Sequence, residues 1–153
     1  MIKKNIPRLL INKDLKLNAR IAINNSDQHY LKKVLRLTRG NRVNVFNGID
    51  GEWESYIDNS AEYNLVCIKK IRNQIECNGP SLYFALIKNY NLRWMIEKVT
   101  ELGVKKLIPI ITERTNNNNF NEKKTWLHIK EACEVSERIT VPSIEKKSTL
   151  INI

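Results

Sequence analysis

Long apolar runs are absent from this 153-residue sequence, and cysteine, glycine and proline are all scarce. No stretch approaches the roughly 18 uninterrupted apolar residues of a membrane span, and the first residues lack the apolar segment of a secretory signal. We therefore expect a cytoplasmic protein with no membrane partner. The cysteines (Cys67, Cys77 and Cys133) include no C-x-x-C pair, which argues against a disulfide framework and against a zinc site, so no metal is expected.

Acidic residues are also in short supply. The 16 Asp and Glu stand against 26 Lys and Arg, which gives a net charge of +10. A field of that sign raises the local concentration of polyanions such as nucleic acids. A compositional explanation competes with this one, because Asn, Ile and Lys make up 57 of the 153 residues, a bias that an A/T-rich genome produces by itself. The placement of arginine is therefore more informative than the excess of lysine.

Between Asp27 and Asp50 the sequence has no acidic residue at all. Five basic residues fall inside this window: Lys32, Lys33, Arg36, Arg39 and Arg42. Guanidinium groups bind phosphate through two parallel hydrogen bonds and stack on bases. The window is therefore our candidate nucleic-acid contact, and a merely solvated basic face is the alternative.

The first half alternates short apolar runs with turn residues, a pattern typical of a small β barrel or sandwich. The expected strands are residues 19–23, 42–46, 52–57 and 63–71. Asn47-Gly48 and Asp50-Gly51 tolerate positive φ, so residues 46–53 are predicted to form a tight hairpin connection.

One helix is predicted to interrupt these strands, with Ser26 as its N-cap. Its apolar stripe comprises Leu31, Val34 and Leu35. This arrangement leaves the basic side chains of residues 32, 33 and 36 on the face that points to solvent.

The pattern changes after a Gly-Pro boundary within residues 74–80. Residues 81–87 form an almost continuous apolar run, as in a strand covered on both faces. Leu92, Met95, Ile96, Val99 and Leu102 then recur at helical spacing, and Gly103 follows at the position of a left-handed C-cap. Residues 107–111 are a second buried strand, so the unit is predicted as strand, crossover helix and parallel strand.

Pro109 removes one ladder donor and therefore predicts an edge strand or a bulge. A second helix is expected after a polar loop, because Trp126, Ile129 and Cys133 are spaced by three and four. Residues 141–144 are the expected start of a third strand. Arg114 lies just past the end of a parallel strand, where ligand sites of α/β sheets form.

Four segments, in order and along nearly all of the chain, resemble the RsmE family, bacterial methyltransferases that modify N3 of a uridine in 16S ribosomal RNA. The segments are Ile6-Pro-Arg8; His29 to Arg36 with Gly40 and residues 43–48; Lys98 to Arg114; and Glu131 to Ile144. The resemblance implies a two-domain α+β protein: a PUA-like β barrel at residues 1–74 that binds RNA, then a SPOUT-type, Rossmann-like α/β domain at 80–153.

The resemblance further implies S-adenosylmethionine as cofactor, 16S rRNA or the small ribosomal subunit as partner, and a homodimer. The RNA-binding residues it suggests are Arg8, Lys32, Lys33, Arg36, Arg39, Arg42, Arg114 and Arg138. No residue is assigned as catalytic.

Several family features are missing from this sequence. The Gly-Pro-Glu-Gly-Gly loop and the later Leu-Gly-x-Arg segment, which tie the knot and hold the cofactor in the family, do not occur. We therefore expect a C-terminally truncated chain whose α/β domain is incomplete, lacks the knot and does not bind S-adenosylmethionine alone. Arg93 stands where an acidic residue is usual, and Glu137 places a carboxylate beside Arg138.

Three hypotheses stay open at this stage. The chain belongs to an rRNA uridine-N3 methyltransferase that is active only with a C-terminal partner or extension, or it is a stand-alone RNA-binding module, or it is an inactive remnant. The third is considered because a sheet of two or three strands leaves a helix-covered face incomplete.

Overall fold

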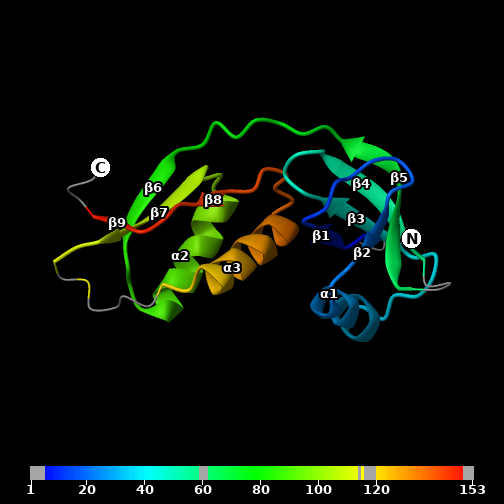
Figure 1. The fold of residues 1–153 in the computed structure, drawn as a ribbon, viewed down its shortest axis with the longest axis horizontal. Helices are drawn as coiled ribbons and strands as arrows, with labels where there is room; N and C mark the ends of the chain where they lie inside the picture. Colours follow the sequence, from blue (N-terminus) through cyan, green and yellow to red (C-terminus); the bar gives the residue numbers. More distant parts are fainter. Residues whose placement is uncertain (1–5, 59–61, 114, 116–119, 150–153) are drawn as a thin grey trace, which may run out of the picture. The chain divides into compact units, whose positions relative to one another are not determined.

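A computed structural model describes residues 6–58, 62–113, 115 and 120–149, and the chain divides into two compact units, residues 1–75 and 76–153 (Figure 1). The first unit contains five strands in the spatial order β1-β3-β4-β5-β2. They are β1 (Arg8–Leu10), β2 (Arg20–Ala22), β3 (Arg42–Phe46), β4 (Glu52–Asp58) and β5 (Asn64–Arg72). A helical segment formed by α1 (Asn25–His29) and the π-helical turn η1 (Tyr30–Val34) separates β2 from β3.

The centre of this sheet is the antiparallel meander β3-β4-β5, which confirms the hairpin predicted across residues 46–53. Gly48 and Gly51 both have positive φ, as the turn requires. Gly51 is needed for a second reason, because a Cβ there would collide with the backbone carbonyl of Arg72. The turn chemistry therefore fixes the register of the meander.

The core of the first unit lies on one face of the sheet. Alternate strand residues such as Leu9, Val43, Val45, Ile57 and Leu65 are fully buried there. β1 was not predicted from the sequence; it pairs in parallel with β3, from which it is separated by more than thirty residues, and β2 pairs with β5 at the other edge. The result is a mixed five-stranded sheet.

The second unit is built on parallel pairing. Its elements are β6 (Ser81–Ala85), α2 (Asn89–Glu101), β7 (Lys106–Ile111), α3 (Glu122–Val135), β8 (Ser143–Ile144) and β9 (Ser148–Thr149). β7 pairs in parallel with β6 on one side and with β8 and β9 on the other, which confirms the predicted strand, helix and parallel strand. Gly103, with φ of 94°, follows the last residues of α2 as the predicted C-cap.

Two expectations about this sheet were wrong in whole or in part. Pro109 is not on an edge strand, because β7 is the central strand. The expected irregularity is present, because Leu107 pairs with Ile144 and Ile110 with Ser148, which leaves one extra residue on the β8–β9 side opposite Pro109. The carbonyl of Leu107 accepts a bond from Glu145 on the β8 side, so Pro109, two residues on, faces the same side, between the partners Ile144 and Ser148. The missing N–H thus falls in the interval where β8 has ended and β9 has not begun.

The second error concerns the covering of β6. The strand was expected to be buried on both faces, but Tyr83 is 48% exposed while its neighbour Phe84 is buried. β6 is an edge strand, and α2 and α3 lie side by side next to the sheet (Figure 1). Ile96 of α2 and Ile129 and Cys133 of α3 are fully buried between these layers.

A buried carboxylate links three strands of the first unit. Glu52 is 2% exposed and binds Arg8 of β1, with Nε at 2.7 Å, and Arg72 of β5, with Nη1 at 3.0 Å. The Arg8 guanidinium also lies 4.3 Å from the ring centre of Phe46. A carboxylate buried at this depth is stable only because both guanidinium groups compensate its charge.

Replacing Glu52 by glutamine should lower the stability of the first unit by about 3 kcal/mol, because the two ion pairs of this buried carboxylate, with Arg8 and Arg72, are then lost. Urea unfolding followed by circular dichroism measures the change. The matched control is Glu54→Gln on the same strand, since Glu54 pairs with the half-exposed Arg42 and should cost less than about 1 kcal/mol. Equal losses in the two variants would show that Glu52 has no special role.

Asp50 ties the loop before β2 to the hairpin, because its carboxylate accepts bonds from the Leu15 amide at 2.9 Å and from Asn47 Nδ2 at 2.6 Å. These donors, led by the Leu15 amide, hold the pKa of Asp50 below the usual aspartate range. A lowered pKa stabilises the fold above the ordinary value, and the stabilisation is lost as pH falls through the folded-state value.

We therefore expect Asp50→Asn to cost about 1 kcal/mol at pH 7. The difference from wild type should begin to shrink as the pH falls below about 4 and should disappear once the pH has passed through the lower folded-state pKa of the carboxylate. Asp14→Asn, an exposed change in the same loop, serves as the control and should have little effect at either pH. A cost for Asp50→Asn that is the same at both pH values would contradict this account.

Candidate nucleic-acid interface

The helical segment of the first unit contains Lys32 and Lys33, two of the five basic residues between Asp27 and Asp50. Asn24, not Ser26 as predicted, is its N-cap, and its side chain accepts a bond from the Asp27 amide at 2.9 Å. After one α-helical turn the chain widens into η1, where the Leu35 amide bonds to the Tyr30 carbonyl. Leu31 is fully buried and anchors this segment on the sheet.

The wider turn alters which side chains face solvent. Val34 was expected in the apolar stripe, but it is 59% exposed. The segment ends at Arg36, whose φ of 54° is the left-handed conformation that commonly closes helices. Lys33 and Arg36 are both exposed, and the side chain of neither makes a hydrogen bond, ion pair or ring contact with another described residue. These two cations are therefore free to bind an external anion.

Lys32 is held differently from its neighbour. Its Nζ lies 4.1 Å from the ring centre of Tyr63, which is only 8% exposed. A cation over an aromatic face keeps its charge while its position is restricted. The ammonium group of Lys32, held over the Tyr63 ring, therefore adds to the positive potential near Lys33.

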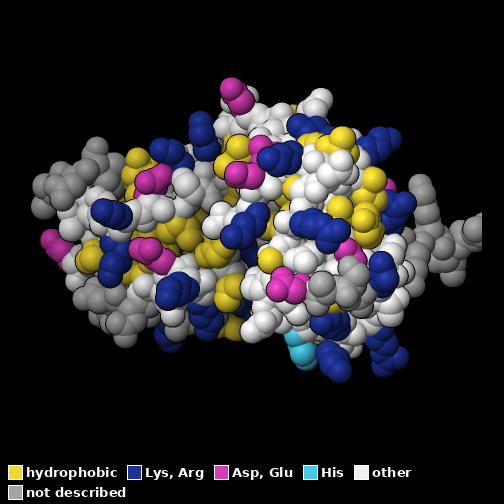
Figure 2. Space-filling model, turned by 45° about the vertical axis from the view of Figure 1, so that its right-hand side comes forward, with side chains coloured by type: hydrophobic (Ala, Val, Ile, Leu, Met, Phe, Trp, Pro, Cys, Tyr) yellow, Lys and Arg dark blue, Asp and Glu magenta, His cyan; other side chains and the backbone are white. Residues whose placement is uncertain are grey.

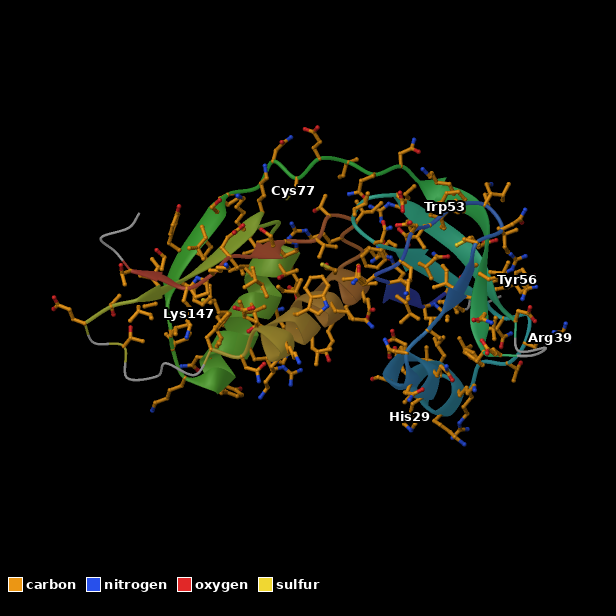
Figure 3. All side chains as sticks on the ribbon, in the orientation of Figure 1. His29, Arg39, Trp53, Tyr56, Cys77 and Lys147 are labelled. Carbon is orange, nitrogen blue, oxygen red and sulfur yellow. The ribbon has the colours of Figure 1, made fainter. Side chains whose placement is uncertain are left out.

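Two more cations, Arg20 and Arg39, lie near each other at the carboxyl end of β4. The Asp58 carboxylate is buried and lies 2.8 Å from Arg20 Nη1 and 3.8 Å from Arg39 Nε. Both arginine side chains stay largely exposed, at 64% and 67%. Figure 3 shows Arg39 on the outer side of the strands. One buried carboxylate thus holds two guanidinium groups near each other at the surface.

Arg20 was missed by the sequence analysis. Arg20 lies outside the window between Asp27 and Asp50. It lies near Arg39 because both bind Asp58, which comes 38 residues after Arg20. The pairing of β2 with β5 and of β5 with β4 brings these residues to one end of the sheet. The only signal in the sequence was the alternation of a basic residue with buried Ile21 in the expected strand.

Other predicted site residues are engaged within the protein. Arg42 binds Glu54 across the β3–β4 pair at 2.7 Å, although half of its side chain stays exposed. Arg8 is only 8% exposed and binds Glu52. This geometry favours a structural part for Arg8, and we leave it out of the proposed RNA surface. Arg114 lies outside the described residues.

Arg138 is also held in place by the protein. Its guanidinium donates to the Thr100 carbonyl at 2.7 Å and to the Val104 carbonyl, and its Nε donates to Thr140 Oγ1 at 2.8 Å. These bonds tie the segment after α3 to the end of α2. The same guanidinium lies 3.3 Å from the Cys77 sulfur. Arg138 therefore stabilises the second unit.

Cys77 and Trp53, both labelled in Figure 3, interact with polar or charged groups of neighbouring residues. Burial raises the pKa of Cys77, but the Gly79 amide, Thr140 and Arg138 outweigh it, so the net pKa of the thiol is lowered. Trp53 donates from Nε1 to the Asp50 carbonyl at 3.2 Å and lies under the Lys70 ammonium, 5.3 Å from the ring centre.

Positive charge is unevenly divided between the units. Residues 1–75 contain 14 Lys and Arg against 7 acidic residues, and residues 76–153 contain 12 against 9. Figure 2 shows basic side chains outnumbering acidic ones on the visible face. Together with the free cations Lys33 and Arg36, this excess makes the first unit suited to binding a polyanion. Among the described residues, no helix is long and apolar enough to cross a bilayer.

Family models divide the chain in the same order as the two units. An RNA methyltransferase PUA domain matches residues 23–59, and an RNA methyltransferase domain matches residues 78–153. Ribosomal RNA small subunit methyltransferase E from Rickettsia conorii is 35% identical over 146 residues, which cover 94% of this chain and 60% of that protein. The protein of the same name from Buchnera aphidicola (subsp. Schizaphis graminum) is 30% identical and covers 98% and 65%.

Solved structures show the same fold. The ribosomal RNA small subunit methyltransferase E from Neisseria gonorrhoeae, bound to S-adenosyl methionine, superimposes with a TM-score of 0.81 at 19% identity, over 95% of this chain and 62% of that one. A methyltransferase from Legionella pneumophila with bound SAM gives 0.77 at 20% identity, over 97% and 65%. This chain thus spans 60% to 65% of the length of these four proteins. Two family models and two relatives aligned over almost the whole sequence confirm the resemblance: the chain belongs to the ribosomal RNA small subunit methyltransferase E family.

Proposed function

We propose that this chain is part of an S-adenosylmethionine-dependent methyltransferase that modifies N3 of a uridine in the 16S rRNA of the small ribosomal subunit. Residues 1–74 act as a PUA-like RNA-binding domain, and residues 80–153 are the N-terminal part of a SPOUT-type methyltransferase domain. The observation that carries the proposal is the order of a basic β unit and a parallel α/β unit, each matched by the corresponding family model. The protein works in the cytoplasm, as a homodimer.

The RNA contact centres on Lys33 and Arg36. They are exposed, lack partners among the described side chains, and belong to the unit with the larger excess of positive charge. Lys32 and the Arg20–Arg39 pair extend the same contact, and Arg42 contributes through its exposed half. Each cation that neutralises a phosphate releases a condensed counterion, so the affinity depends on salt.

S-adenosylmethionine supplies the methyl group when it is bound to the intact enzyme. The described residues of this chain do not fit it. At the carboxyl end of β7, where a parallel sheet places its ligands, the hydroxyls of Thr112 and Thr115 bond to each other at 2.9 Å. The buried carboxylates among the described residues, which could accept ribose hydroxyls, all lie in residues 1–75. We therefore assign no described residue to the cofactor and none to catalysis.

Residues 1–74 are proposed to bind RNA, and no described residue is assigned to the cofactor. We therefore predict that this chain binds small-subunit RNA but transfers no methyl group by itself. Purified chain, unmethylated small ribosomal subunits and S-adenosylmethionine with a labelled methyl group are incubated together, and label in the RNA is counted. Incorporation of label would overturn the assignment of no cofactor residue here, and failure to bind the subunit would overturn the proposed function.

Reversing both free charges, in Lys33→Glu with Arg36→Glu, should weaken binding to a 16S rRNA fragment by at least about tenfold and reduce the salt slope by about 1.4 to 1.8. Filter binding over a range of salt concentrations measures both quantities. Lys123→Glu with Lys124→Glu is the matched control, because it changes the net charge equally on exposed residues of α3. If both double variants weaken binding equally, the effect comes from net charge and the proposed contact is wrong.

A further inference from the structure

Three side chains with metal-binding atoms meet where α2 and α3 pack. Glu97 comes from α2, and His128 and Glu131 come from α3, spaced so that they share one face of that helix. One ligand atom from each residue lies within 4.8 Å of the other two. A divalent ion placed between the three atoms would link the two helices.

His128 provides an unused donor atom in this cluster. Its side chain is 12% exposed, and Nδ1 is buried with no hydrogen-bond partner. The closest carboxylate oxygen, from Glu131, is 4.0 Å away, beyond hydrogen-bond distance. A buried polar atom without a partner is costly and needs an explanation.

A side-chain cation already lies against the two carboxylates. Arg93 Nε is 2.7 Å from Glu97 Oε1, and Arg93 Nη2 is 3.7 Å from Glu131 Oε2. The guanidinium shows that this location favours positive charge, but it leaves the imidazole nitrogen unpaired. Arg93 is 57% exposed, so more than half of its side chain already lies in solvent.

We propose that Glu97, His128 and Glu131 bind a zinc-type divalent ion, for which Arg93 is the displaceable occupant. Zinc binds both imidazole nitrogen and carboxylate oxygen, and a site with three protein ligands leaves the fourth position to water. The nitrogen ligand favours zinc over magnesium or calcium, which prefer sites made entirely of oxygen atoms. The sequence did not predict this cluster, because its members come from two helices. The bound ion clamps α2 to α3.

Zinc ion alone is the probe. Metal-free chain carrying Cys77→Ser, which removes the partly exposed thiol, is titrated with Zn²⁺ by calorimetry, and thermal unfolding is followed with and without the ion. We expect one ion per chain and a higher unfolding temperature with zinc. His128→Ala should weaken binding by more than about tenfold, the size of effect that removing even an outer-shell partner can cause. Arg93→Gln should tighten binding, since its guanidinium no longer competes.

His29→Ala is the matched control, because it removes the other histidine of the sequence, on α1 in the first unit. It should leave zinc binding unchanged. If His128→Ala fails to fold, Glu131→Gln replaces it, because that side chain is 58% exposed, and it too should bind more weakly than wild type. No zinc uptake by the wild-type chain, an equal loss in His29→Ala, or weaker binding by Arg93→Gln would each overturn the proposal.

Discussion

The assembly of the first unit depends on the buried carboxylate of Glu52. Its position at the start of β4 allows one residue to bind an arginine from β1 and another from β5, with β3 lying between β1 and β4. The charge of Glu52 would be strongly unfavourable in this place without both partners. The ion pairs therefore specify where the short N-terminal strand joins the sheet, which three residues of backbone pairing alone would define only weakly.

Carboxylates also determine which cations of this unit are free for an external partner. Glu52 holds Arg8 and Arg72, and Glu54 holds Arg42. Asp58 orients two arginines but leaves most of each in solvent. No acidic residue follows Asp27 until Asp50, so no carboxylate close in sequence after Asp27 is available to neutralise Lys33 and Arg36. The free charge thus comes from a gap in the acidic residues as much as from the excess of basic ones.

Local patterns in the sequence predicted the regular elements well. The strands β3 and β4 with their hairpin, the cap at Gly103 and the parallel pairing of β6 with β7 all follow from alternation, turn residues and helical spacing. β1 was not predicted, because it has three residues and its partner is distant in the sequence. The widening at η1 was not predicted either, since Tyr30 to Val34 carries no residue that distinguishes a π-helical turn from an α-helical one.

The candidate site was less predictable than the fold, because it depends on contacts between distant residues. Sequence position could not show that Arg138 donates to carbonyls at the end of α2, or that Arg20 and Arg39 share Asp58.

The central claim is that RNA is held by the basic first unit. Ultraviolet cross-linking of the chain to small ribosomal subunits, with the linked peptides identified by mass spectrometry, tests it most directly. We predict cross-links within residues 20–42, and cross-links confined to residues 76–153 would contradict the account.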